Sequence, residues 1–177
     1  MRRALLMPLL LLSGFLAAAC DEKPAEPLPD AREITSSSVA AFCGMSLPEH
    51  PGPKAQIFVK DRAEPVWFAS VHDMFAYMLL PEEPKAIRAI YVNDMGRVRN
   101  WEHPEPGTWV EARGAVFVIG SRKHGGMDEN EAVPFSLEAD ARAFIARNGG
   151  RLVDFGKVPA DYVLPRSDAA TAGGERG

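Results

Sequence analysis

The stretch VWFASVHDMFAYM at residues 66–78 has a counterpart further along the chain, VPFSLEADARAFI at residues 133–145. At a constant offset of 67 residues, Val66 matches Val133, Phe68 matches Phe135 and Asp73 matches Asp140. Each copy begins with a few β-prone apolar residues and continues with apolar residues at helical spacing. The repetition predicts a duplicated strand–helix unit.

The flanking residues extend this unit in both directions. Alternating, β-rich stretches precede the two copies at 55–60 and 108–120, and further apolar stretches follow them at 86–94 and 151–158. Short strands are expected at 65–69 and 132–136, and helices at 70–79 and 137–148. Ser70 with Asp73 is typical of a helix start, and Gly149 of a helix end. The sequence therefore predicts an α+β fold of two tandem ββαβ units, at about 52–100 and 107–160.

The apolar residues on the predicted strand faces and helix stripes form the expected core. They are Phe58, Val66, Phe68, Ile90, Val92, Val116, Val118, Phe135, Phe144, Leu152 and Phe155.

The N-terminal sequence MRRALLMPLLLLSGFLAAAC is typical of a bacterial export signal. Arg2 and Arg3 precede an apolar run, and small residues precede Cys20, as in a lipobox. We expect residues 1–19 to be a signal peptide and Cys20 to be lipidated. The alternative is ordinary cleavage near Ala19 with Cys20 unmodified.

The rest of the domain organisation follows from composition. The polar, Pro-rich residues 20–39 are expected to form a flexible tether, residues 40–165 the folded domain and residues 166–177 a disordered tail. A lipid-anchored protein of the cell envelope that faces the periplasm is predicted, with the inner or outer membrane left open. The formal net charge of −4 and the absence of Lys/Arg clusters argue against nucleic-acid binding.

The chain has 2 cysteines, and lipidation of Cys20 leaves Cys43 without a partner. Cys43-Gly44-Met45 joins a thiolate to a thioether, and such soft ligands favour Cu(I). Gly44 allows the backbone to bend so that both sulfur atoms reach one ion. The alternative is a buried cysteine beside a core methionine.

A further ligand is sought in the polar, Gly-containing loop at 121–130, where Met127 has little packing to gain. Met127 is the first choice and His124 the second, because imidazole also binds copper. Met74 and Met78 read as a core stripe, and His50, His72 and His103 are too dispersed to predict a chelate. No catalytic or phosphate-binding motif is present.

Several segments in order resemble the nitrous oxide reductase accessory lipoproteins called NosL. They are FCGMSLPEHPGPKAQIFVKD, VWFASVHDMFAYML, IYVNDMGRVRNW, GGMDENEAVPFS and DFGKVPADYV, spread from Ala41 to Pro165. The resemblance implies a pair of ββαβ units, similar in topology to a part of organomercurial lyase. It also places the family's copper ligands at Cys43 and Met45. The family often has Gly directly after the methionine of the GGM segment, where this chain has Asp128.

The resemblance implies a chaperone that binds Cu(I) and supplies nitrous oxide reductase, with its copper-assembly machinery, during denitrification. It implies ligand exchange rather than enzymatic turnover. The alternatives are a structural lipoprotein with a buried Cys43 and a thiol-dependent enzyme that cleaves carbon–metal bonds. The latter chemistry requires more than one reactive thiol.

Overall fold

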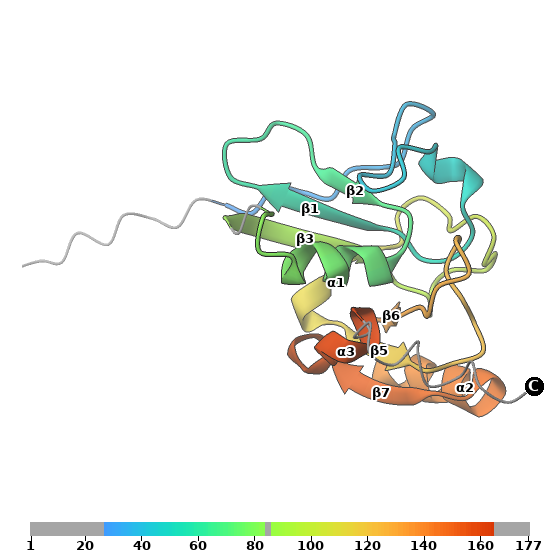
Figure 1. Cartoon of the computed structure of the whole chain (residues 1–177). Coiled ribbons are helices and arrows are strands. Elements are labelled where there is room, and N and C mark those ends of the chain that lie inside the picture. The colour runs from blue at the N-terminus through green and yellow to red at the C-terminus, as the bar shows by residue number, and fades with distance from the viewer. Residues whose placement is uncertain (1–26, 84–85, 165–177) are drawn as a thin grey trace, which may run out of the picture.

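The computed structural model describes residues 27–83 and 86–164, and within them the chain forms two ββαβ units (Figure 1). The first unit contains β1 (Ala55–Val59), β2 (Val66–Phe68), α1 (Val71–Leu79) and β3 (Ile87–Asn93). The second contains β5 (Val116–Ile119), β6 (Val133–Phe135), α2 (Glu138–Asn148) and β7 (Arg151–Asp154). The predicted α+β fold and its tandem repetition are confirmed.

Strand pairing repeats as well as element order. The two antiparallel sheets have the orders β2-β1-β3-β4 and β6-β5-β7, so that the first strand of each unit lies between the other two. Ile57 on β1 is paired with Val66 and Ile90. Val118 on β5 is paired in the same way, with Val133 and Leu152.

The predicted single strand over 108–120 is wrong. The chain forms β4 (Trp109–Glu111), a short 3-10 helix η2 (Ala112–Gly114) and then β5, and β4 joins β3 in the first sheet. The break occurs because the Glu111 carboxylate accepts hydrogen bonds from the N–H groups of Arg113 and Gly114, at 2.8 and 3.2 Å. The strand β4, which directly precedes the second unit in the chain, is thus part of the sheet of the first unit.

The C-terminal strand is also shorter than predicted. β7 ends at Asp154, and the chain continues as the 3-10 helix η3 (Phe155–Lys157) and the short helix α3 (Ala160–Val163). Both predicted long helices are confirmed to within one residue at each end. Ser70 caps α1 by accepting a hydrogen bond from the Asp73 N–H at 3.0 Å.

The apolar core crosses the boundary between the units. One cluster joins Ile57 and Phe68 of the first unit to Phe117 and Val153 of the second. Most of the predicted core is buried: Phe58, Val66, Phe68, Ile90, Val92, Val118, Phe135 and Phe144. Val116, Leu152 and Phe155 are only half-buried, because they pack at the margins of the two main clusters.

Residues 27–39 belong to the folded part, so the expected tether does not extend to residue 39. The buried Gln56 side chain accepts a hydrogen bond from Arg32 N–H at 2.8 Å and donates one to Arg32 O at 2.9 Å. Tyr91 donates its hydroxyl to Pro29 O at 2.8 Å. Composition missed this contact, because a polar segment can be held through its backbone without contributing to the core.

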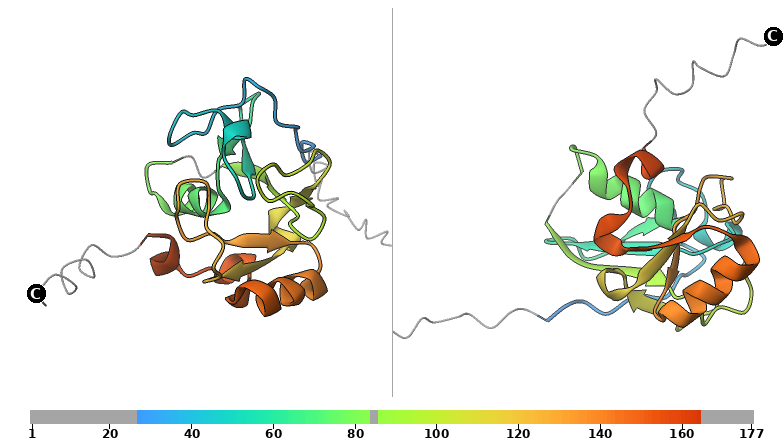
Figure 2. Two further views of the ribbon diagram at one scale, coloured as in Figure 1. Left: turned by 90° about the vertical axis from the view of Figure 1, so that its right-hand side faces the viewer. Right: turned by 90° about the horizontal axis from the view of Figure 1, so that it is seen from below.

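Two connecting segments lie on the same side of the domain. The 3-10 helix η1 (Leu47–Glu49) and the loop between β5 and β6 both lie on the side that the left view of Figure 2 turns toward the reader. In the described residues, no helix is long and apolar enough to cross a membrane. Residues 1–26 and 165–177, which include Cys20 and the whole of the predicted tail, are outside the described residues.

Candidate metal centre

Cys43 lies in a small hairpin formed by residues 39–46. Val39 and Ser46 form an antiparallel bridge, Ala40 N–H donates to Met45 O at 2.9 Å, and Gly44 N–H donates to Ala40 O at 2.8 Å. Gly44 has a φ of +66°, a left-handed conformation that costs a residue with a Cβ roughly 1 kcal/mol. The predicted role of Gly44 as the bend between the two sulfur-bearing residues is consistent with this geometry.

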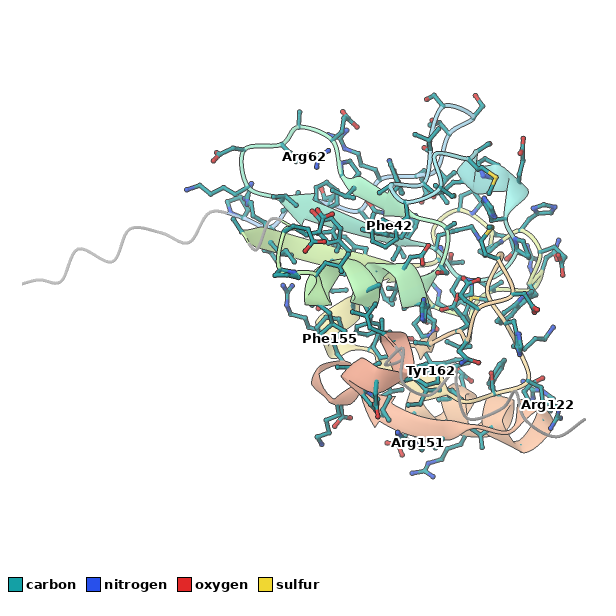
Figure 3. The ribbon with its side chains drawn as sticks, viewed as in Figure 1. Phe42, Arg62, Arg122, Arg151, Phe155 and Tyr162 are labelled. Carbon is teal, nitrogen blue, oxygen red and sulfur yellow. The ribbon has the colours of Figure 1, made fainter. Side chains whose placement is uncertain are left out.

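The hairpin is anchored to the first unit from both sides. Ala40 and Leu47 are buried against Ala69, and the aromatic ring of Phe42 packs on those of Phe68 and Tyr77, with centroid distances of 5.8 and 6.5 Å (Figure 3). Ala41 N–H also donates to Trp67 O at 2.8 Å. The main chain at Cys43 is therefore held at both ends, while its side chain faces solvent.

Within residues 27–83 and 86–164, three sulfur-bearing side chains are exposed. Cys43 is exposed and free, and Met45 and Met127 are 41% and 57% exposed. An exposed Cys43 contradicts the alternative of a core cysteine. Exposed thioethers contribute little to stability, and their sulfur atoms are accessible to a ligand from solution.

His50 brings the hairpin and the Met127 loop (residues 121–130) together. Its Nε2 lies 4.0 Å from Cys43 Sγ. On the other side, a Cβ placed at Gly126 would lie 3.0 Å from His50 Cβ and Nδ1, which means that the loop passes directly against the imidazole ring. The residue next to Met127 and the thiol of Cys43 thus contact the same buried side chain.

The dispersed positions of His50, His72 and His103 in the sequence predicted no chelate, and the structure adds that His50 lies next to Cys43. In the sequence, Pro48 is the one indication of this position. It lies within η1, where His50 N–H donates to Leu47 O at 3.2 Å, so the chain turns back just after the hairpin. Within the described part of the chain, the structure shows no contact of His72 or His103 with Cys43. His72 lies at the start of α1 and His103 in the loop before β4.

The Met127 loop has its own internal structure. His124 and Asn130 form an antiparallel bridge, Gly125 N–H donates to Glu129 O at 3.0 Å, and Met127 N–H donates to the Glu129 carboxylate at 2.8 Å. Asp128, where the resemblance led us to expect glycine, has a φ of +63°. Aspartate tolerates this conformation better than most residues, so the turn is kept.

His124 is turned toward its own loop. Its Nδ1 lies 2.8 Å from Asp128 Oδ1. This pairing occupies Nδ1 and leaves Nε2 available, as in many histidines that bind metals. In the two described ranges, no group of three or more His, Cys, Asp and Glu side chains is placed to hold a metal ion.

Two buried titratable side chains, Lys54 and Glu131, also belong to this region. Lys54 donates from Nζ to Pro51 O and Gly52 O at 3.0 and 2.6 Å, and burial lowers its pKa from 10.5 to about 8. With His50 it lines a cavity of about 290 Å³. Burial raises the pKa of Glu131 well above its usual range, and the nearby Glu129 charge acts in the same direction. Glu131 Oε1 accepts from the His72 N–H at 3.0 Å.

These observations define a class of protein: within its described residues, an α+β domain with an exposed free thiol and two exposed thioethers, and with a buried imidazole next to the thiol. Comparisons with known proteins agree. The family model NosL matches residues 31–163. The chain is 39% identical over 165 residues to the copper-binding lipoprotein NosL of Achromobacter cycloclastes, covering 93% of this chain and 85% of that protein.

Two further relatives support the same assignment. The copper-binding lipoprotein NosL of Stutzerimonas stutzeri is 33% identical over 153 residues, covering 85% of this chain and 77% of that protein. The crystal structure of the copper chaperone NosL from Shewanella denitrificans superposes with a TM-score of 0.71 and 34% identity, covering 76% of this chain and 98% of that one. The chain therefore belongs to the NosL family.

Proposed function

We propose that this protein is a lipid-anchored carrier of the cell envelope that binds Cu(I) through Cys43, Met45 and Met127 and delivers it to nitrous oxide reductase. The observation that carries the proposal is the meeting of the Cys43 hairpin and the Met127 loop at His50. A thiolate with thioethers suits Cu(I) better than harder cations. The relatives named as copper-binding lipoproteins and as a copper chaperone support the choice of metal.

We propose His50 as an additional donor in this set. Its Nε2 faces Cys43 Sγ, so the imidazole either completes the copper coordination or orients the thiolate. Binding converts the Cys43 thiol to a thiolate and releases one proton, so that affinity falls as the pH falls.

The exposed site favours transfer by ligand exchange. A thiolate of the acceptor forms a bond to Cu(I) while one of the bonds to a thioether breaks, and the bond to Cys43 breaks last. The copper remains Cu(I) throughout, and the freed Cys43 thiolate takes up a proton from water. This sequence needs no catalytic group, in keeping with a carrier rather than an enzyme.

Met127→Leu is expected to weaken Cu(I) binding about tenfold, because one thioether ligand is lost. The apo protein is expected to lose less than about 1.5 kcal/mol of unfolding free energy, since Leu and Met have similar volumes and the side chain is exposed. Anaerobic titration against a competing Cu(I) chelator and urea denaturation measure the two quantities. Met95→Leu is the control, because Met95 packs on the second core cluster. Unchanged copper affinity in Met127→Leu would reject Met127 and favour His124.

The membrane anchor is a separate proposal, since Cys20 is outside the described residues. Intact mass of protein extracted from membranes is expected to show that residues 1–19 are missing and that acyl mass is added. A freely soluble product of unmodified mass would contradict lipidation and leave the copper proposal unaffected.

A further inference from the structure

One hydroxyl group closes the base of the Met127 loop. Gly120, just before the loop, donates its N–H to Tyr162 Oη at 3.0 Å, and Tyr162 Oη in turn donates to the carbonyl of Glu131, just after the loop, at 2.9 Å. Gly120 and Glu131 are the residues that flank the loop at its two ends. The Tyr162 side chain therefore bridges the point where the chain leaves β5 and the point where it returns toward β6.

Tyr162 is itself firmly placed. It lies on α3, which packs against α1, and its ring packs at the margin of the main core cluster (Figure 3). Burial raises the pKa of Tyr162, and the hydrogen bond from Gly120 N–H acts in the opposite direction. The hydroxyl is therefore protonated at neutral pH, as in an ordinary tyrosine, and it can accept from Gly120 and donate to Glu131 at the same time.

The Glu131 side chain adds a second attachment at the same end. Its Oε1 accepts from the His72 N–H in the first turn of α1 and from the Ala132 N–H, at 3.0 and 2.8 Å. Glu131 is 1% exposed. At the C-terminal end of the loop, Glu131 is thus joined to α3 through its backbone carbonyl and to α1 through its side-chain carboxyl group.

The loop makes little apolar contact with the rest of the domain. Within residues 121–130 only Gly125 is buried, so apolar packing contributes little to the position of Met127. Polar contacts restrain the loop instead. Besides the bonds at its base and within it, Arg122 N–H donates to Asn148 O at 2.9 Å, Lys123 Nζ lies 4.9 Å from the centroid of the Trp101 ring, and Gly126 lies against His50. A loop fixed in its binding conformation loses less entropy when its ligand binds.

We propose that Tyr162 is a positioning residue that holds the Met127 loop against the Cys43 hairpin, and so prepares Met127 to bind Cu(I). The proposal rests on the proposed function, because it takes Met127 as a copper ligand. Tyr162 does not touch the metal. It acts through the geometry of the loop.

The test is Tyr162→Phe in the full chain, purified anaerobically in detergent. Phenylalanine removes both hydrogen bonds. It keeps the packed ring, and the fold is therefore retained. Cu(I) affinity is expected to fall roughly tenfold. Tyr91→Phe is the matched control: Tyr91 also donates its hydroxyl to a carbonyl, that of Pro29, away from the loop, and its loss is expected to leave the affinity unchanged.

A double variant separates positioning from general destabilisation. In a Met127→Leu background, Tyr162→Phe is expected to cause no further loss of affinity, because the ligand that it positions is already absent. An additional tenfold loss in that background, or an affinity within twofold of the wild type for the single variant, would overturn the proposal.

Hydrogen exchange of the apo protein distinguishes failure of this inference from failure of the proposed function. Tyr162→Phe is expected to speed exchange of the loop amides of Gly125 and Met127, while those of β1 remain protected. Unchanged exchange in the loop would overturn the positioning role even if Met127 binds copper. Faster exchange together with normal copper affinity in Met127→Leu would overturn the copper ligand set, and with it the link between Tyr162 and copper.

Discussion

Replacing Cys43 by serine is expected to reduce Cu(I) affinity by well over about a hundredfold. Loss of residues that merely orient a metal ligand costs roughly 10–100-fold, and Cys43 is the only thiol in residues 27–83 and 86–164. The remaining thioethers and imidazole are neutral donors that hold Cu(I) weakly. Because Cys43 is exposed, the unfolding free energy of the apo protein is expected to change by less than about 0.5 kcal/mol. Anaerobic competition titration and urea denaturation of the same preparations measure both quantities.

In cells, Cys43→Ser is expected to act like deletion of the protein. Nitrous oxide reductase should be exported and folded but short of copper, because a carrier contributes metal and takes no part in catalysis. The measurement is copper per purified reductase from strains grown at limiting copper, and added copper should partly restore loading by mass action. Full loading in the Cys43→Ser strain at limiting copper would contradict the delivery role, whatever the purified protein binds.

The second large effect concerns Lys54, whose burial makes stability depend on pH. Its folded pKa of about 8 lies below the ordinary lysine pKa of 10.5, so the folded state holds fewer protons between these values than the unfolded state. The contribution of Lys54 to stability therefore rises as the pH increases through this window and is lost as the pH falls through 8. Between about pH 7.5 and pH 9.5 the gain is expected to be about 2 kcal/mol.

Lys54→Met isolates this contribution. The variant should lack the rise seen in the wild type, whereas Lys60→Met, which removes an exposed lysine from the end of β1, should keep it. Glu131, Glu129 and Glu102 favour the charged form of Lys54. Glu131 itself contributes the opposite slope, because its raised pKa favours folding at low pH; it is present in all three proteins, so the difference between curves reports Lys54. Parallel curves for wild type and Lys54→Met from urea denaturation would show that the lysine is not desolvated.

Much of the architecture could be predicted because it depends on neighbouring residues. The 67-residue repeat, the alternation on β1 and β5 and the Ser70 cap each reflect a local pattern that the backbone must satisfy. The limits of this approach are visible at 108–120. Both halves of that segment alternate, and only the pairing of β4 with β3 shows that they belong to different sheets.

The candidate site divides in the same way. The residue types at Cys43, Gly44 and Met45 indicated soft-metal chemistry without any structure, because three adjacent residues carry both the ligands and the bend. The sequence by itself thus determined the repeated unit, the ends of its helices and the chemical nature of the candidate ligands. The tertiary structure decided that His50 lies between Cys43 and Gly126, and that Tyr162 closes the base of the Met127 loop. The physical reason is that these contacts join residues far apart in the chain, and their distances are set by the packing of the two units against a shared core.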